Sequence, residues 1–205
     1  MPSRPWLPNR TRANVAIASI ALFAASSIAA AIVTGFTLAH FGEIEDTATL
    51  DSVWTVVTFT SVGAYVACGI TFLFWFRRAY GNAYATGLRG AHTVGWAVGA
   101  WFVPFLNLVR PAQIAGEMWR HAGPARVGAP GLIGIWWTSY LVHHFADNIG
   151  SRLIDDADSA ALGLKFLLAS DLAALLGLGL AFLMVQRLTA AHEGMHLGDQ
   201  AEVFA

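Results

Sequence analysis

The stretch NVAIASIALFAASSIAAAIVTGFTLAHF, from Asn14 to Phe41, contains no Asp, Glu, Lys or Arg. A helix needs about 20 apolar residues to cross the hydrocarbon core of a bilayer, so this stretch is long enough to span. Arg4, Arg10 and Arg12 precede it, as basic residues precede the apolar region of a signal peptide, but that region has only about 7–15 residues. The stretch therefore predicts a retained first membrane helix over about 14–40.

Three further stretches are apolar over about 20 residues each, and they predict membrane helices at about 51–76, 131–150 and 162–187. The composition agrees, because 56% of the 205 residues are hydrophobic and only 12% are charged, outside the balance of a soluble domain. Lipid has to cover apolar blocks of this length. The sequence thus predicts an all-α integral membrane protein, a single membrane domain over residues 1–205 with the lipid bilayer as its partner.

A shorter apolar stretch, from Gly95 to Val109, carries Pro104 in its middle and Asn107 near its end. Proline removes a backbone donor and breaks helical hydrogen bonding, which favours a non-helical step at this point. We expect a re-entrant or half-inserted segment over 95–109. The alternative is a full crossing, which would give five spanning helices, since about 15 residues can cross a locally thinned bilayer.

The distribution of basic residues distinguishes these two topologies, because Lys and Arg accumulate in the cytoplasmic loops of membrane proteins. With four spans, only Arg152 and Lys165 lie outside, and ten arginines lie inside. With five spans, Arg110, Arg120, Arg126 and Arg187 move outside and the asymmetry nearly disappears. The sequence therefore favours four spans in a bacterial inner membrane, with both termini cytoplasmic.

Two polar segments flank the last spans. Pro111 stands in the favoured first-turn position of a helix over 111–121, and this helix places four apolar residues on one face, which is typical of an interfacial helix: Ile114, Ala115, Met118 and Trp119. The tail over 189–205 is expected to be cytoplasmic and solvated. Its His192 and His196 have a spacing that can bind a metal on a helix, but we expect no metal site in a mobile tail.

The segment from Phe74 to Arg120 resembles the bacterial membrane family catalogued as domain of unknown function 4328. The likeness rests on a tryptophan and arginine that close a span, an asparagine soon after, and a pattern of Trp, Pro and Asn in the broken stretch: Trp75, Arg78, Asn82, Trp96, Trp101, Pro104, Asn107 and Pro111. The resemblance implies a bacterial multi-pass membrane protein. It implies no activity.

Ionisable residues inside predicted spans are costly and are therefore candidates for function. Asp171 lies nine residues into the last span, and His143 and His144 lie at a similar depth in the preceding antiparallel span. A histidine opposite this aspartate could exchange protons. Together with Asp147, these residues form a candidate intramembrane polar site, and a metal site is the weaker alternative.

Small residues recur every four positions in the last span, at Ala169, Ala173, Gly177 and Ala181, which lets another helix approach closely. Asp171 points away from this row and cannot comfortably face lipid. Either the last helix touches protein on two sides, or Asp171 is protonated, or a second subunit covers it. A homo-oligomer or another membrane subunit is therefore an expected partner.

The charge pattern excludes nucleic acid as a partner, because the net charge is −1 and the arginines form no basic tract. A phosphate-binding glycine loop and a Gly-x-Ser-x-Gly elbow are both missing from the sequence. We expect no enzyme, no cofactor and no resident metal. The leading hypothesis is a non-catalytic membrane scaffold that contacts lipid or a partner protein. The alternative is a small transporter or channel component that moves protons or ions through the polar site.

Overall fold

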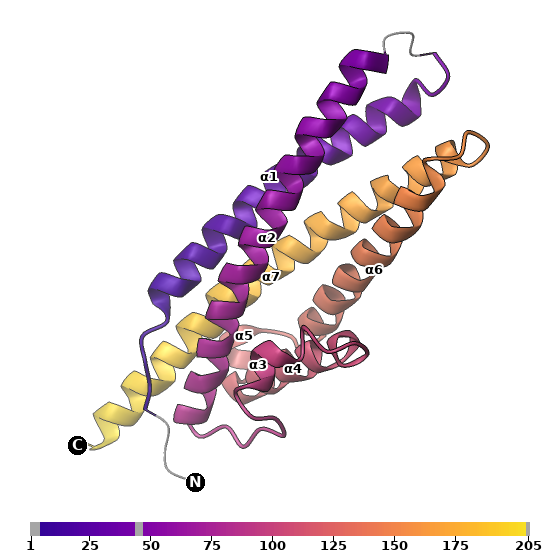
Figure 1. Cartoon of the computed structure of the whole chain (residues 1–205). Helices are drawn as coiled ribbons and strands as arrows, with labels where there is room; N and C mark the ends of the chain where they lie inside the picture. The colour runs from indigo at the N-terminus through magenta and orange to yellow at the C-terminus, as the bar shows by residue number, and fades with distance from the viewer. Residues whose placement is uncertain (1–4, 44–46, 204–205) are drawn as a thin grey trace. The chain divides into compact units, whose positions relative to one another are not determined.

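The computed structural model describes residues 5–43 and 47–203, and these residues form helices joined by turns (Figure 1). Arg4, one of the basic residues before the first predicted span, lies outside the described residues. The elements are α1 (Arg10–Ala39), α2 (Thr47–Ala85), α3 (Trp96–Gly99), the 3-10 turn η1 (Leu106–Leu108), α4 (Arg110–Ala122), α5 (Pro124–Val127), α6 (Gly131–Leu153) and α7 (Ala160–Val203).

Three helices in the described part are long and apolar enough to cross a membrane: α1, α2 and α7. Their large apolar side chains are widely exposed, as at Ile32 (65%) and Phe59 (75%), which is the pattern of helices that lipid covers. The prediction of an all-helical chain with apolar spans is therefore confirmed for these three. The predicted span 131–150 is also a helix, α6, but its aromatic and polar residues lower its hydropathy.

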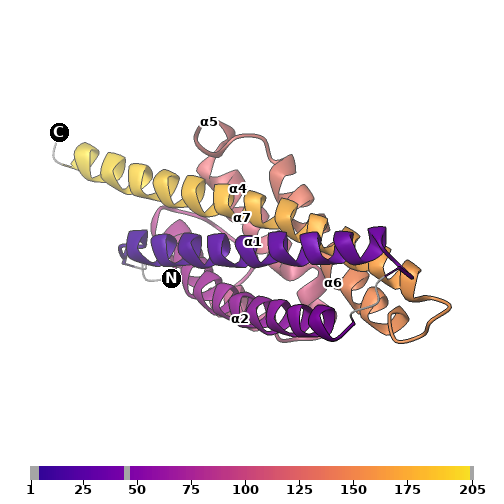
Figure 2. The same ribbon diagram turned by 90° about the horizontal axis from the view of Figure 1, so that it is seen from above.

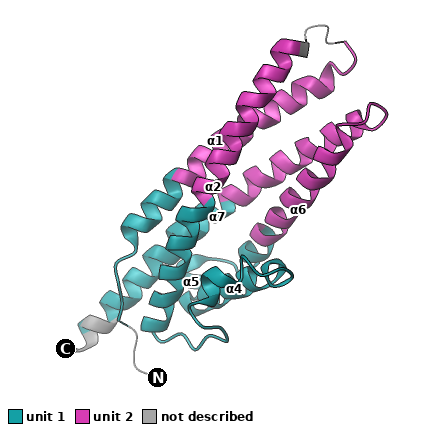
Figure 3. Cartoon of the chain, in the orientation of Figure 1, with its two compact units in different colours: residues 1–18, 69–135, 180–205 teal, residues 19–68, 136–179 magenta. Residues whose placement is uncertain are grey.

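The chain divides into two compact units, each made of segments that are distant in sequence (Figure 3). Unit 1 comprises residues 1–18, 69–135 and 180–205, and unit 2 comprises residues 19–68 and 136–179. The four long helices, α1, α2, α6 and α7, each have residues in both units.

Unit 1 contains the short helices α3, α4 and α5 (Figure 1), and α4 contacts both of the others. Figure 2 shows α4 and α5 from above. Its core is aromatic, with Trp75, Phe76 and Trp119 almost fully buried. The apolar face predicted for residues 111–121 exists in α4, but Ile114 and Met118 are completely buried against protein. The amphipathicity of α4 therefore serves the packing of unit 1.

The end of the chain differs from the solvated tail that the sequence predicts. Helix α7 continues through Val203, and Leu188 and His192 are buried. The reason is a tertiary contact, because the Trp75 indole Nε1–H donates a 3.0 Å hydrogen bond to Thr189 Oγ1. Thr189 thus attaches α7 to α2 just beyond the predicted span.

Unit 2 contains a close helix crossing between α6 and α7. A Cβ added at Gly150 would lie 2.9 Å from the Gly163 carbonyl oxygen, and one at Gly163 would lie 2.9 Å from the Ile154 backbone nitrogen. Only glycine leaves room for backbones at this separation. One glycine on each helix, Gly150 and Gly163, therefore allows α6 and α7 to approach this closely.

The stretch over 95–109 is broken, as Pro104 predicts. It contains four residues of α3, a series of turns and the three-residue η1, and no continuous helix passes through it. Phe105 follows the proline with a φ of 63°, in the left-handed region that non-glycine residues rarely adopt. Phe105 is the centre of a tight turn, because the Leu106 N–H donates to the Pro104 carbonyl oxygen at 2.8 Å.

Candidate functional site

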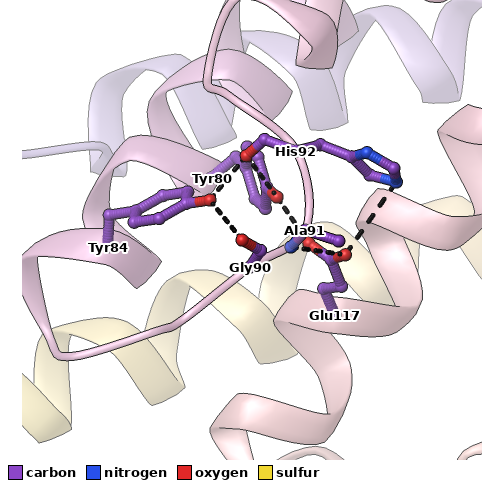
Figure 4. A network of polar contacts seen from close by, with 6 residues as sticks. All are labelled: Tyr80, Tyr84, Gly90, Ala91, His92 and Glu117. Carbon is purple, nitrogen blue, oxygen red and sulfur yellow. Dashed lines mark hydrogen bonds and ion pairs between the residues drawn. The ribbon is translucent and has the colours of Figure 1, made fainter.

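A polar network in unit 1 joins the end of α2 to α4 and to the loop over 86–95 (Figure 4). The Tyr80 hydroxyl donates to the Glu117 carboxylate and also lies 3.0 Å from the His92 carbonyl oxygen. The Tyr84 hydroxyl lies 2.5 Å from that same carbonyl and 3.1 Å from the carbonyl of Gly90. Two phenolic protons thus serve three acceptors.

Glu117 is central to this network, and its side chain is only 13% exposed. One carboxylate oxygen, Oε1, accepts the Ala91 backbone N–H at 3.1 Å and lies 3.9 Å from His92 Nε2. The other, Oε2, accepts from Tyr80. Both oxygens are therefore occupied by the protein itself, as in a structural carboxylate rather than a catalytic base.

Gly90 is the point where the loop passes closest to these groups. A Cβ added there would lie 2.6 Å from the Tyr80 hydroxyl, 2.7 Å from Glu117 Oε2 and 2.8 Å from the Tyr84 hydroxyl. Only glycine fits between three polar atoms at these distances. The loop is thus held by side chains on both sides.

This network is absent from the sites that the sequence predicts, although the sequence contains a signal for it. Glu117 is the single acidic residue between Asp51 and Asp147, in a segment with six arginines. Tyr80 and Tyr84 are four apart and therefore share a face of α2. That the carboxylate meets tyrosines rather than an arginine depends on tertiary structure.

Two residues of the family-like pattern, Asn82 and Trp75, hold the N-terminal segment in unit 1. The Asn82 side chain accepts the Leu7 N–H at 3.1 Å and donates to the Leu7 carbonyl at 2.8 Å, as a paired strand would. The Trp75 carbonyl accepts from the Asn9 side chain at 3.4 Å. Arg78, one turn before Asn82, is half-buried.

The other members of the pattern shape the broken stretch. The Arg110 guanidinium lies 4.5 Å from the centre of the Trp96 ring, a cation–π contact, and Trp101 packs edge-on against Phe72 at 5.9 Å. Pro111 is fully buried at the start of α4. Asn107 donates its backbone N–H to the Val103 carbonyl at 3.0 Å, and its side chain is half-buried.

Between these anchored ends, the stretch around exposed Pro104 presents a row of apolar side chains outward. We call it the apolar tip: Phe102 (71% exposed), Val103 (38%), Phe105 (83%), Leu108 (38%) and Val109 (51%). Single exposed apolar residues are common on proteins, but five within eight residues form a patch that marks a membrane or protein contact.

His121 of α4 completes the polar contacts of the network region. Its Nε2 lies 3.0 Å from the Thr86 hydroxyl. Burial lowers the pKa of His121, the hydrogen bond to Thr86 opposes this shift, and the positive charge of Arg126 adds to it. The pKa of His121 is therefore lower in the folded protein than in the unfolded chain.

In unit 2, the structure brings His143 to Ser170 rather than to Asp171. His143 Nδ1 lies 2.8 Å from the Ser170 hydroxyl, which in turn donates to the His143 carbonyl at 3.1 Å. His144 packs against Tyr140, with ring centres 4.3 Å apart, and its Nε2 is buried without a hydrogen-bond partner. His143 of α6 thus meets the residue next to Asp171 on α7, and its partner there is a hydroxyl.

Asp171 lies on another face of α7, where its carboxylate accepts a 3.4 Å hydrogen bond from Thr34 of α1. The last helix thus touches protein on two sides within unit 2, through Ser170 and through Asp171. A second subunit is not needed to cover this carboxylate. Asp147 is exposed, and its carbonyl accepts a hydrogen bond from Ser151.

Residues 192–196 read His-Glu-Gly-Met-His, the helical spacing of zinc-dependent peptidases, which the sequence analysis considered only as a pair of histidines. In the structure, two residues of this motif have other partners. Glu193 pairs with Arg10 at 2.7 Å, and the His196 ring stacks on Trp6 at 4.2 Å. Among the described side chains, no group of three His, Cys, Asp or Glu could hold a metal ion.

The long apolar helices are those of a membrane protein. The chain belongs to the family described as Domain of unknown function (DUF4328), whose family model matches residues 36–190. This match includes the Tyr80–Glu117 network, the apolar tip and the His143–Ser170 contact of unit 2, whereas Thr34, the partner of Asp171, lies just before it. No curated protein and no solved structure matches the chain.

Proposed function

We propose that this chain is a non-catalytic, multi-pass protein of the bacterial inner membrane, and that residues 86–122 form a scaffold at the cytoplasmic membrane interface. Four helices cross the bilayer in this proposal, with α6 as the fourth, and both termini lie in the cytoplasm. The stretch over 95–109 enters the bilayer only partway.

The observation that carries this proposal is that the side chains of the apolar tip are exposed while both ends of the stretch are held by contacts with the protein. Phe102 and Phe105 are exposed by 71% and 83%, although burying one phenylalanine is worth about 1.5–3 kcal/mol. The ends of the stretch are held by buried Pro111 and by the Trp96–Arg110 contact. A bilayer interface would cover the exposed rings, and the arginine beside them would meet lipid headgroups.

The left-handed backbone of Phe105 supports the same proposal. A non-glycine residue in a sparsely populated conformation costs about 1–3 kcal/mol, and such residues cluster at functional positions. Phe105 has no internal packing that would offset this cost, because its side chain is exposed. Burial of its ring in lipid would offset it.

The topology is tested by a reporter that is active on only one side of the membrane, fused at Gly123. The proposal predicts cytoplasmic activity there, on the same side as a fusion at the C-terminus. Periplasmic activity at Gly123 with cytoplasmic activity at the C-terminus would contradict a half-inserted stretch and support a full crossing.

The contact surface is tested by replacing Phe105 with a photo-crosslinking phenylalanine analogue in cells. The proposal predicts crosslinks to phospholipid, whereas the same analogue at Phe36, an exposed position of α1, provides the control for lipid contact in a span. A crosslink from position 105 to one protein of defined mass would instead make the apolar tip a partner site.

A transporter or channel component is the second candidate, and the polar side chains within the spans favour it. Asp171 hydrogen-bonds to Thr34, and the buried His144 Nε2 is unpaired. Ionisable groups in spans often mark ion pathways. The test is proton and cation flux in liposomes: Asp171→Asn should reduce it, and equal flux in the variant and the wild type would remove this candidate.

We also propose a homo-oligomer, supported by the exposed apolar faces of the spans and by the small residues of α7. Gly177 approaches Ser139 of α6 closely, with an added Cβ at 3.4 Å, whereas Ala169 at the other end of the row is exposed. Light scattering in detergent should give a mass of at least two chains. A strict monomer would refute this proposal.

A further inference from the structure

Three arginines of unit 1 lie close together without a carboxylate partner. Arg12 of α1 and Arg77 of α2 are near enough to Arg78 for their positive charges to repel its charge. In the described part of the chain, the ion pairs are Arg10–Glu193 and His92–Glu117, and neither includes these three residues. The cluster therefore has excess positive charge.

An open groove of about 210 Å³ lies beside this cluster, lined by Thr11, Arg12, Val15, Thr71 and Phe74. Its walls are mainly apolar, and Val15 and Phe74 are 50% and 62% exposed. The groove thus combines one charged end with an apolar body. These two properties are complementary to an amphipathic ligand that has an anionic head and an apolar tail.

The helix register places Arg78 at the same end as Arg12. Thr71, Phe74 and Arg78 are three and four residues apart, so they share one face of α2. Val15 follows Arg12 by three residues and therefore extends the groove away from the charge along α1. Arginines 12 and 78 flank the predicted spans 14–40 and 51–76, which puts them at headgroup level in the proposed topology.

We propose that this groove binds an anionic phospholipid of the cytoplasmic leaflet, with its phosphate at Arg12 and Arg78 and one acyl chain along Val15 and Phe74. This inference rests on the proposed function, which supplies the orientation of α1 and α2. Charge complementarity selects this occupant, because a zwitterionic lipid would leave the arginine cluster uncompensated. Arginine also binds phosphate through paired N–H donors.

The inference is tested by native mass spectrometry of the full chain in detergent, with phosphatidylglycerol and phosphatidylcholine added at equal concentration. Each arginine near an anionic lipid contributes about fivefold in affinity, so wild type should retain phosphatidylglycerol at least about tenfold better. Arg12→Gln with Arg78→Gln should abolish this preference. Arg152→Gln, an exposed arginine of α6, is the matched control and should leave it unchanged.

A second variant tests the acyl-chain part of the groove without changing charge. Val15→Trp fills the groove from an exposed position, so it should release phosphatidylglycerol while leaving the thermal unfolding of the protein unchanged. Retention of lipid by Val15→Trp would overturn the placement of an acyl chain in the groove. Electrostatic attraction between the arginines and the headgroup would then account for the binding. Equal retention by the double arginine variant would overturn the site altogether.

Two further controls separate the alternatives. Displacement of phosphatidylglycerol by millimolar inorganic phosphate would indicate an anion site and overturn the lipid as occupant. Failure of the proposed function is distinguishable, since it would appear as periplasmic activity of the Gly123 fusion. Failure of the lipid site would appear as unchanged lipid preference in variants with normal topology.

Discussion

The loop over 86–95 and the apolar tip are both irregular segments of unit 1 between α2 and α4, but they are held in opposite ways. The loop is fixed by Tyr80, Tyr84 and Glu117, which bind its backbone. The apolar tip has a strained residue, Phe105, and its large side chains are exposed. The difference indicates that the loop is stabilised by contacts within the protein, whereas the apolar tip is suited to contact a membrane or another molecule.

The largest expected effect comes from removing the centre of the loop network. Glu117→Ala deprives the Ala91 N–H and the Tyr80 hydroxyl of their shared acceptor, which should lower the free energy of unfolding by about 1.5–3 kcal/mol. Thermal unfolding in detergent measures this loss. Glu117→Gln keeps one carbonyl oxygen and should lose less. Equal stability of Glu117→Ala and wild type would show that the loop is not fixed by this residue.

Gly90→Ala tests the same loop from the other side. The added Cβ would meet three oxygen atoms at 2.6–2.8 Å, so the loop or the tyrosines must move. We expect a loss of about 1–3 kcal/mol, the usual cost of overpacking. Gly87→Ala is not a matched control, because Gly87 has a φ of 95°. Gly95→Ala is the control: its added Cβ would meet the Thr93 hydroxyl oxygen at 3.8 Å, an ordinary contact distance, and it should be nearly neutral.

Phe105→Gly should raise the free energy of unfolding, in contrast to the two substitutions above. Glycine adopts a φ of 63° without strain, and the phenyl ring is 83% exposed, so little packing is lost. We expect a gain of about 0.5–1 kcal/mol in detergent, together with weaker lipid crosslinking by its neighbours. A clear loss of stability would mean that the ring packs against the protein, and the contrast between the two segments would disappear.

The smallest effect concerns the pH dependence of the network region. Burial lowers the pKa of His121 below its unfolded value of about 6.5, so the unfolded chain binds the proton more readily. Stability is therefore fully present above pH about 6.5 and falls as the pH drops toward the folded pKa. His121→Gln removes this component.

The measurement is the unfolding temperature of wild type and His121→Gln at pH 7.5 and 5.5. Thr86 and Arg126 are present in both proteins, and the charge of His121 also lowers the pKa of nearby His192. The difference therefore reports His121 together with its effect on His192. Wild type should lose more on acidification than the variant does. An equal loss would show that His121 contributes nothing to the pH dependence.

Local sequence patterns predicted the elements of this fold well. Apolar stretches located α1, α2 and α7, the pattern after Pro111 located α4, and Pro104 marked the break between them. These features depend on residues near one another in sequence. The span predicted over 131–150 is the helix α6, and its tryptophans and histidines make it less apolar than α1, α2 and α7.

The candidate sites depend on contacts that sequence spacing does not encode. His143 meets Ser170 instead of Asp171 because adjacent residues of a helix point about 100° apart. Glu117 meets Tyr80 across 37 positions, and the polar end of α7 stays helical because Trp75 binds Thr189. In each case, the contact is made with a residue of another helix, which the sequence alone does not identify.

The central claim, that the apolar tip enters the bilayer while the loop over 86–95 does not, is tested by the depth of a fluorescent label. Phe105→Cys and Ala91→Cys, each with Cys68→Ala, are labelled and reconstituted into vesicles that contain lipids brominated on their acyl chains. The account predicts strong quenching at position 105 and little at position 91. Equally weak quenching at both positions would contradict it.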